Sequence, residues 1–161
     1  IISGSVITFD DGVRQRAAVW IQPNQRTPWT LLQLPDAGIS SEALSSVCQE
    51  RCWVSGYVDG SVALWSFEAA GSPATGTRDS ALPRIEHDDQ DPGPVTVMAA
   101  GRPALVVSHT GTTRLLVNDG QDWRTFMGPA GPVIDAATMG DRLYAITRAP
   151  DGVQLWTTPV P

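Results

Sequence analysis

The sequence predicts an all-β fold, a β-propeller segment of about three and a half four-stranded blades that forms part of a larger ring. Three observations support this prediction. A phrase of strand, turn and strand recurs four times, equivalent positions lie about 40 to 50 residues apart, and no window of about ten residues has the apolar spacing of a helix. The 13 Pro and 15 Gly of the 161-residue chain also interrupt it too often for helices.

Each copy of the phrase predicts one β-hairpin. The four copies are residues 6–20, 53–65, 104–117 and 143–156. Tight hairpin turns need left-handed backbone conformations, which Asp-Gly pairs adopt readily. Such pairs occur at Asp11-Gly12, Asp59-Gly60 and Asp151-Gly152. The sequence therefore predicts a tight turn in three of the four hairpins.

Large aromatic side chains occupy the second strands of three hairpins. We expect Trp20, Trp65 and Trp156 to pack at equivalent places against a neighbouring blade, with ligand stacking as the alternative role. Strands that lie between two blades are covered on both faces, which explains the continuous apolar runs ALVV at 104–107 and LYAI at 143–146. Trp53 is off this register and is expected at a surface or rim.

Short apolar segments between the hairpins predict the remaining strands. These segments are 29–35, 43–48, 94–101, 122–131 and 133–140. With the strands of a blade labelled A to D outward from the axis, the order is BC, DABC, DABC, DABC, or about fourteen strands. The approximate repeats are 1–35, 36–83, 94–129 and 132–161 within a single domain, 1–161.

This order leaves the first blade without an A strand and the last blade without a D strand. We expect further blades of the same protein to complete the ring. A partner chain, or a four-bladed ring with one truncated blade, are the alternatives. A β-sandwich has the same short strands with turns every 8 to 12 residues, so it is the competing all-β fold.

Two turn segments carry a resemblance to a known repeat family. NDGQDW at 118–123 and NQRTPW at 24–29 are the best local matches. On these residues and the hairpin phrase, the chain resembles the bacterial Asp-box (BNR-like) and related extracytoplasmic β-propeller repeats. The first match has its glycine one place early, and the second has neither glycine nor acid. The resemblance implies a folding device and carries no catalytic residue.

The two cysteines, Cys48 and Cys52, flank the turn between two predicted strands. Because a short turn brings strand ends together, a disulfide is geometrically reasonable there. Free buried thiols and a metal site are the alternatives, although His87 and His109, the only histidines, are far off in sequence. The resembling repeats also have a C…C-x-x-x-G pattern, which Cys48, Cys52 and Gly56 match. A disulfide would imply an exported protein.

Composition and charge exclude several functions. The formal net charge is −6, and nucleic acid and anionic membranes attract clustered positive charge instead. All eleven basic residues are Arg, which excludes a Schiff-base lysine and a phosphate-loop lysine. No apolar run approaches the length of about 18 to 20 residues that spans a bilayer. We predict no cofactor.

Candidates for catalysis or metal binding are few. Ser108 and His109 resemble a nucleophile and its base, but neighbours on a strand point to opposite faces and cannot pair directly. An acidic segment could offer oxygen ligands to calcium, although it lacks the spacing of a calcium loop. Its residues are Glu86, Asp88, Asp89 and Asp91, with His87 among them. A charge run in a long connection is more often simply solvated, so no metal site is predicted.

A sialidase-type hydrolase needs a Tyr nucleophile with a Glu partner and an Arg cluster at the mouth of the propeller. Tyr57 and Tyr144 lie on predicted strands, and Glu50 and Arg51 are close to Tyr57 only in sequence. Aromatic residues that pack along strands are the simpler interpretation.

The sequence therefore predicts an exported, non-enzymatic β-propeller scaffold that binds a protein partner or mediates assembly. The long connection 68–93 is the expected contact region, because its length exceeds what a blade needs. A lobe of a carbohydrate-active, sialidase-like hydrolase, with its catalytic residues mostly outside this segment, is the alternative. We expect an extracytoplasmic location, reached through export or an envelope anchor preceding this segment.

Overall fold

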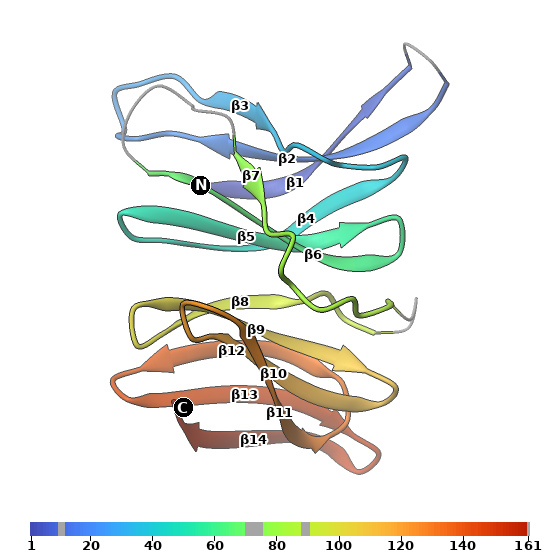
Figure 1. The fold of residues 1–161 in the computed structure, drawn as a ribbon, viewed down its shortest axis with the longest axis vertical. Coiled ribbons are helices and arrows are strands. Elements are labelled where there is room, and N and C mark those ends of the chain that lie inside the picture. The colour runs from blue at the N-terminus through green and yellow to red at the C-terminus, as the bar shows by residue number, and fades with distance from the viewer. Residues whose placement is uncertain (10–11, 70–75, 88–90, 161) are drawn as a thin grey trace. The chain divides into compact units, whose positions relative to one another are not determined.

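The computed structural model describes residues 1–9, 12–69, 76–87 and 91–160, and this described part of the chain forms fourteen β-strands and no helix (Figure 1). The strands make four antiparallel sheets, which we number in chain order. Contacts divide the chain into two units, Ile1–Leu82 and Pro83–Pro161, each holding two sheets. We describe each unit by itself.

Unit 1 contains the first and second sheets. The first sheet is β1 (Ile2–Thr8), β2 (Arg14–Ile21) and β3 (Thr30–Gln33). The second sheet is β4 (Ser41–Cys48), β5 (Arg51–Val58), β6 (Ser61–Glu68) and the short β7 (Thr77–Arg78). Each strand pairs with the next one along the chain, so both sheets are simple meanders.

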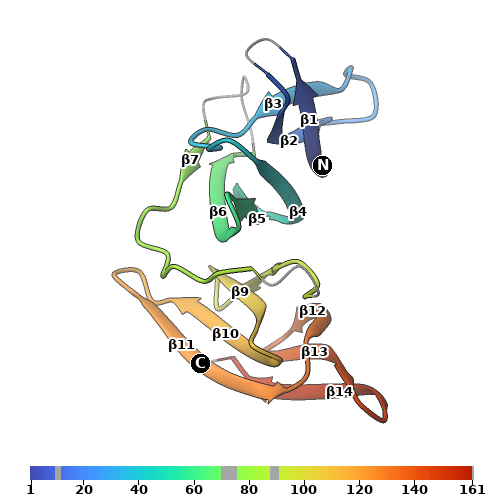
Figure 2. The ribbon, with the colours of Figure 1, turned by 90° about the vertical axis from the view of Figure 1, so that its right-hand side faces the viewer.

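The core of unit 1 lies between these two sheets, where β4 packs on β1 and β2 (Figure 2). Alternate residues of β2, β5 and β6 point into it, because side chains on a strand alternate between faces. Trp65 is its largest fully buried side chain, and Trp65 Nε1 donates a 2.8 Å hydrogen bond to the carbonyl oxygen of Pro35. The indole thus fills the core while its one polar group is satisfied.

Unit 2 contains the third and fourth sheets. The third sheet is β8 (Val95–Ala99), β9 (Arg102–His109), β10 (Thr112–Asn118) and β11 (Trp123–Ala130). The fourth sheet is β12 (Val133–Met139), β13 (Arg142–Ala149) and β14 (Gly152–Pro159). Both sheets are again meanders of consecutive strands.

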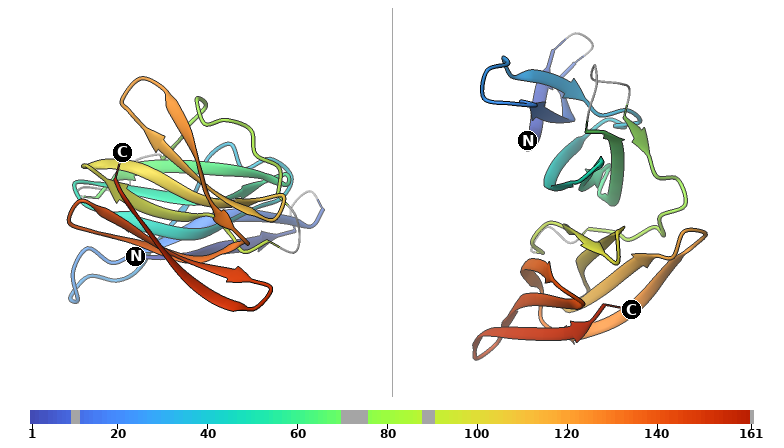
Figure 3. Two further views of the ribbon diagram at one scale, coloured as in Figure 1. Left: turned by 90° about the horizontal axis from the view of Figure 1, so that it is seen from below. Right: turned by 90° about the vertical axis from the view of Figure 1, so that its left-hand side faces the viewer.

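In the core of unit 2, β12 packs against β8 and β9, and both sheets are visible in the two views of Figure 3. Val106 and Leu115 come from the third sheet, Leu143 and Ala145 from the fourth, and Trp156 packs against this cluster. The buried Ser108 Oγ accepts a 2.9 Å hydrogen bond from the backbone N–H of Val133, which joins the two sheets directly.

The all-β prediction is confirmed, and every predicted strand has a counterpart. In chain order the four sheets have three, four, four and three strands. The two continuous apolar runs, 104–107 and 143–146, differ in burial, however. Residues 104–107 are all buried, whereas Ile146 is 37% exposed and Tyr144 is half-buried. The face of β13 that carries Ile146 is therefore not covered within unit 2.

Turn geometry follows the expectation at Asp59-Gly60, where both residues have positive φ (47° and 78°). Asp11 lies outside the described residues. At the third Asp-Gly pair only Gly152 has a positive φ. The Asp59 carboxylate also accepts hydrogen bonds from the backbone N–H groups of Ile39 and Ser40, each at 2.9 Å. This carboxylate therefore ties the β5–β6 turn to the segment that leads into β4.

Candidate functional site

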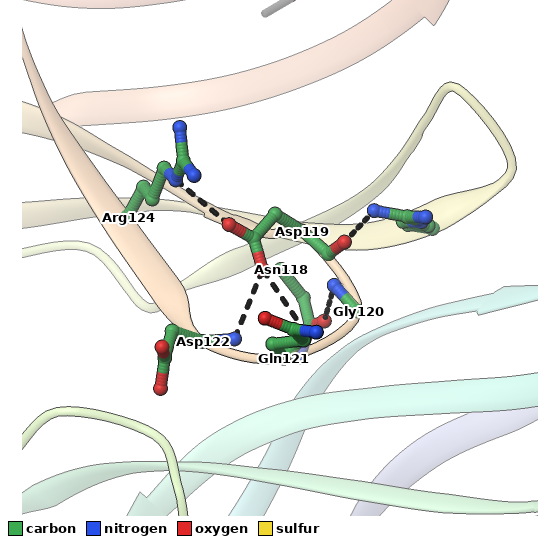
Figure 4. Close-up of polar contacts among 7 residues, drawn as sticks. Asn118, Asp119, Gly120, Gln121, Asp122 and Arg124 are labelled. Atoms are coloured by element: carbon green, nitrogen blue, oxygen red, sulfur yellow. Dashed lines mark hydrogen bonds and ion pairs between the residues drawn. The ribbon is translucent and has the colours of Figure 1, made fainter.

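Side-chain and backbone groups form a connected set of hydrogen bonds in the turn between β10 and β11, which Figure 4 shows at close range. Asn118 Oδ1 accepts the backbone N–H of Gly120 at 2.7 Å, and Gly120 has a φ of 98°. Asp119 Oδ1 accepts the N–H groups of Gln121 at 3.0 Å and Asp122 at 2.9 Å. The Asn-Asp-Gly sequence folds this way because short polar side chains cap the backbone donors of a turn.

Two arginines hold the same aspartate from outside the turn. Arg124 Nε lies 2.7 Å from Asp119 Oδ2 (Figure 4), and Arg102 donates a guanidinium N–H to the carbonyl oxygen of Asp119. The hydrogen bonds from the backbone of Asp122 and Gln121 lower the pKa of Asp119, and the nearby Arg124 lowers it further. Asp119 is therefore held as a carboxylate.

This arrangement has a structural consequence and no evident chemical one. Both carboxylate oxygens of Asp119 already have partners within the chain. A general acid or base needs a proton that it can exchange near neutral pH, and a carboxylate with a lowered pKa does not supply it. The turn closes the β10–β11 hairpin.

The cysteines are joined in the structure by a disulfide, with the sulfur atoms 2.08 Å apart. Cys48 and Cys52 face each other at the β4–β5 hairpin end. Cys52 is only 3% exposed and belongs to the core of unit 1. Gly56 pairs with Ala43 farther along the same hairpin, and a side chain at this position would overlap the carbonyl oxygen of Glu42.

Ser108 and His109 do not form a catalytic pair. Ser108 is 7% exposed and its Oγ accepts the N–H of Val133. The side chain of His109 lies on the opposite face of β9, as the strand alternation predicted. The serine is thus a cross-sheet connector.

Within unit 1, the residues considered for a sialidase-type site are not brought together. Tyr57 is 7% exposed and six residues along β5 from Arg51, a separation of about 20 Å on an extended strand. Arg51 forms an exposed ion pair with Glu68 instead. Glu50 is exposed beyond the start of β5, and Tyr144 is half-buried on β13 in the other unit.

The acidic segment is only partly described, because Asp88 and Asp89 lie outside the described residues. Within it, Glu86 forms an exposed ion pair with Arg84. Among the described residues no group of three or more His, Cys, Asp or Glu side chains is placed to hold a metal ion. The same gaps affect the long connection 68–93, whose residues 70–75 and 88–90 are not described.

The three tryptophans share one side of their sheets, although not one register. Trp65 and Trp156 each stand four pairs beyond the pair that closes their hairpin turn, opposite Val54 and Ala145. Trp20 stands six pairs beyond the closing pair, opposite Ile2. Side chains alternate between the two faces along a strand, so positions four and six pairs from the turn lie on the same face. Trp20 is half-buried and is not among the residues of the core cluster of unit 1.

The first and fourth sheets also carry exposed apolar side chains that the sequence did not predict. On the first sheet Ile2 is 54% and Leu31 is 43% exposed, and on the fourth sheet Val153 is 66% and Leu155 is 69% exposed. These side chains recur along their strands at the same spacing as buried apolar side chains do, so this spacing does not distinguish exposed from buried positions. The break in the repeat order, with three strands in the first and last sheets, was the one available indication.

Comparisons with known proteins add no family assignment. The described part of the chain has no helix long and apolar enough to cross a membrane. No protein-family model matches the chain, and no curated protein shows significant similarity to it. The assignment of function therefore depends on the geometry described above.

Proposed function

We propose that the chain is a non-enzymatic segment of an exported β-propeller of the Asp-box-like type, a scaffold that binds a protein partner or mediates assembly. The observation that carries the proposal is the repeated meander sheet, with four strands in the second and third sheets and three in the first and last. Consecutive antiparallel sheets of about four strands are the building units of propellers.

The disulfide supports export. Cytosolic reductants keep thiols reduced, so a structural disulfide is typical of secreted, periplasmic or cell-surface proteins. Cys48 and Cys52 close a hairpin end, and Cys52 is buried in the core, which is a structural and not a catalytic placement.

Exposed apolar side chains at one end of unit 1 support a binding role. Phe9, Val13 and Ile39 are each 74% exposed, although large apolar side chains normally avoid water. A bridge between Gln15 and Ser40 brings the β1–β2 turn and the segment before β4 together. Exposed apolar groups that gather on loops at the end of rigid sheets suit contact with a protein.

The candidate catalytic side chains support a non-enzymatic role, because each already serves the fold. Ser108 accepts a backbone N–H, and Arg51 pairs with Glu68. A catalytic group must instead be free to contact a substrate.

Hydrolysis of fluorogenic sialosides and other glycosides tests the proposal against a hydrolase lobe. We expect no turnover above a heat-denatured sample of the same protein. Turnover that persists through purification and is abolished in Tyr57→Phe or Tyr144→Phe would overturn the non-enzymatic assignment. Exported protein that remains fully reactive with a thiol reagent after unfolding would overturn the disulfide argument for export.

A further inference from the structure

The two cysteines of the β4–β5 disulfide differ sharply in exposure. Cys48 and Cys52 face each other in the register of the hairpin and are covalently joined. Cys48 is exposed, whereas Cys52 is only 3% exposed. One cysteine of the bond is therefore accessible from solvent, and the other is not.

The surroundings of Cys52 are apolar. Cys52 faces Phe67 across β5 and β6, and Phe67 is itself only 4% exposed. Both residues belong to the core cluster of unit 1, together with Val54 and Trp65. Apolar surroundings disfavour the charged form of a thiol, so a Cys52 released from the disulfide takes up a proton and stays neutral.

The surroundings of Cys48 are polar and open. Cys48 ends β4, and the three residues that follow it, Gln49, Glu50 and Arg51, are all exposed. Arg51 forms an ion pair with Glu68, with 2.5 Å between Arg51 Nη2 and Glu68 Oε1. The approach to Cys48 therefore leads past solvent-exposed polar residues.

Thiol–disulfide exchange requires access to the sulfur that is attacked. A thiolate attacks one sulfur of the bond, a new S–S bond forms there, and the other sulfur leaves with the electron pair. Attack at Cys48 joins the incoming sulfur to Cys48 and releases the Cys52 thiolate, which takes its proton from water. The incoming sulfur is oxidised and that of Cys52 is reduced, so the exchange needs no other oxidant or reductant. Attack at Cys52 is blocked by the core that covers it.

The turn that the disulfide closes also holds the start of the long connection 68–93. The carbonyl oxygen of Glu50 accepts the backbone N–H of Ala69 at 3.0 Å. Arg51, which begins β5, pairs with Glu68, which ends β6. Opening the disulfide removes the covalent closure of this turn, so only backbone pairing then keeps these two contacts in place.

We propose that Cys48 is a thiol-modification site. An external thiolate opens the disulfide by attack at Cys48, and the opening loosens the attachment of Ala69 to the turn. The thiolate comes from a small thiol such as glutathione or from the reactive cysteine of a thiol–disulfide oxidoreductase. The proposal goes beyond the scaffold function and depends on the disulfide alone.

The test incubates the folded chain with glutathione, quenches the exchange with acid and blocks the released thiol by alkylation. Proteolytic cleavage after Arg51 separates the two cysteines into different peptides, and mass spectrometry locates the adduct. We expect glutathione on Cys48 at least about tenfold more often than on Cys52. The rate should not change at denaturant concentrations too low to unfold the chain, because the folded chain reacts.

Alkylation of the unfolded starting protein comes first, and free thiols at this stage would remove the basis of the proposal. A dithiol oxidoreductase whose second cysteine is replaced by serine gives the same readout for a protein thiol. An adduct with both reagents assigns the site to thiolates in general, and an adduct with only one of them identifies the source.

Two substitutions at Phe67 test whether the burial of Cys52 sets the preference. Phe67→Ala removes the ring that faces Cys52, so adducts at Cys52 should become more frequent. Phe67→Leu is the milder variant if Phe67→Ala does not fold. Glu68→Gln, on the next residue, is the matched control, because it removes the ion pair without uncovering Cys52 and should keep the preference for Cys48.

Hydrogen exchange reports the loosening of the turn. The amide of Ala69 donates to Glu50 and should exchange at least about tenfold faster in the Cys48 adduct than in the disulfide form. The amide of Leu34, which donates to the carbonyl oxygen of Ala17 at 2.9 Å in the same unit, is the control and should not change.

Three results would contradict the proposal: equal modification of the two cysteines, an exchange rate that follows global unfolding, or an unchanged exchange rate at the amide of Ala69. None of them affects the glycoside assay. The thiol-modification site and the non-enzymatic assignment can therefore fail separately.

Discussion

The hydroxyl of Ser108 accepts a hydrogen bond from the backbone N–H of Val133, 25 residues later, and both residues are almost fully buried. The bond connects β9 of the third sheet to the first strand of the fourth. Unit 1 has a related contact, because Ser41 Oγ accepts the N–H of Ala17 at 2.8 Å. A buried serine thus joins the two sheets in each unit.

Replacing Ser108 by Ala should destabilise the protein by about 1 to 3 kcal/mol, because the buried N–H of Val133 would lose its acceptor. Denaturant unfolding followed by tryptophan fluorescence measures the change. Ser80→Ala, at an exposed position, is the control and should change the free energy of unfolding by less than about 0.5 kcal/mol. Equal effects of the two substitutions would contradict this role for Ser108.

Replacing Cys48 by Ala should lower the free energy of unfolding by about 2 kcal/mol, the loop-entropy value for so short a loop. Cys48 is the appropriate choice because it is exposed, whereas removing Cys52 would also leave a hole in the core. Denaturant unfolding with and without a reductant gives the internal control. The unmodified chain should become as unstable as Cys48→Ala when reduced, and the variant should not respond to the reductant.

Asp119 should titrate below the range of an ordinary aspartate, about 3.9, because backbone N–H groups and Arg124 favour its charged form. Its folded-state pKa is depressed, so its contribution to stability is present above the unfolded-state pKa and is lost as the pH falls through the folded-state pKa. Carboxyl chemical shifts followed by NMR report the titration directly.

Two variants separate the causes of this pKa shift. Arg124→Ala should raise the pKa of Asp119 only in part, because the backbone donors of Asp122 and Gln121 are the larger cause. Gln121→Ala should leave it unchanged, since the backbone N–H that donates to Asp119 remains. A return to the ordinary value in Arg124→Ala would show that the ion pair is dominant.

Gly56→Ala should be among the most damaging single substitutions, costing about 3 kcal/mol or more, because a methyl group there would overlap the backbone of Glu42. Gly60→Ala is the matched control four residues on. Nothing lies within 4 Å of its added carbon, so it should cost only about 1 to 2 kcal/mol for the left-handed backbone. Thermal unfolding followed by circular dichroism would rank the two, and a greater loss for Gly60→Ala would contradict the steric argument.

Local sequence predicted the strands well because their determinants are local. The Asp59-Gly60 pair, between two apolar runs, predicted a turn that the structure has, with positive φ at both residues. The two-residue strand β7 had no such signal inside the long connection. The sequence also could not show that Ile146 is exposed and Val106 buried, since an apolar pair has the same spacing whether or not another sheet covers it.

The candidate site was predictable only in outline. The NDGQDW segment identified a turn, but the contact of Arg102 with Asp119, 17 residues away in the chain, depends on the pairing of strands. The role of Ser108 depends on a partner in another sheet, which sequence neighbours do not indicate.

Because every sheet is made of consecutive strands, each sheet is held together almost entirely by pairing between strands that follow one another in the chain. Loop-closure entropy is small for such contacts, so each sheet can assemble early and without waiting for distant parts of the chain. For the same reason, each sheet is a unit that can be duplicated or deleted as a whole. A gene that gains or loses one repeat adds or removes a whole sheet, and no remaining strand has to change its partner.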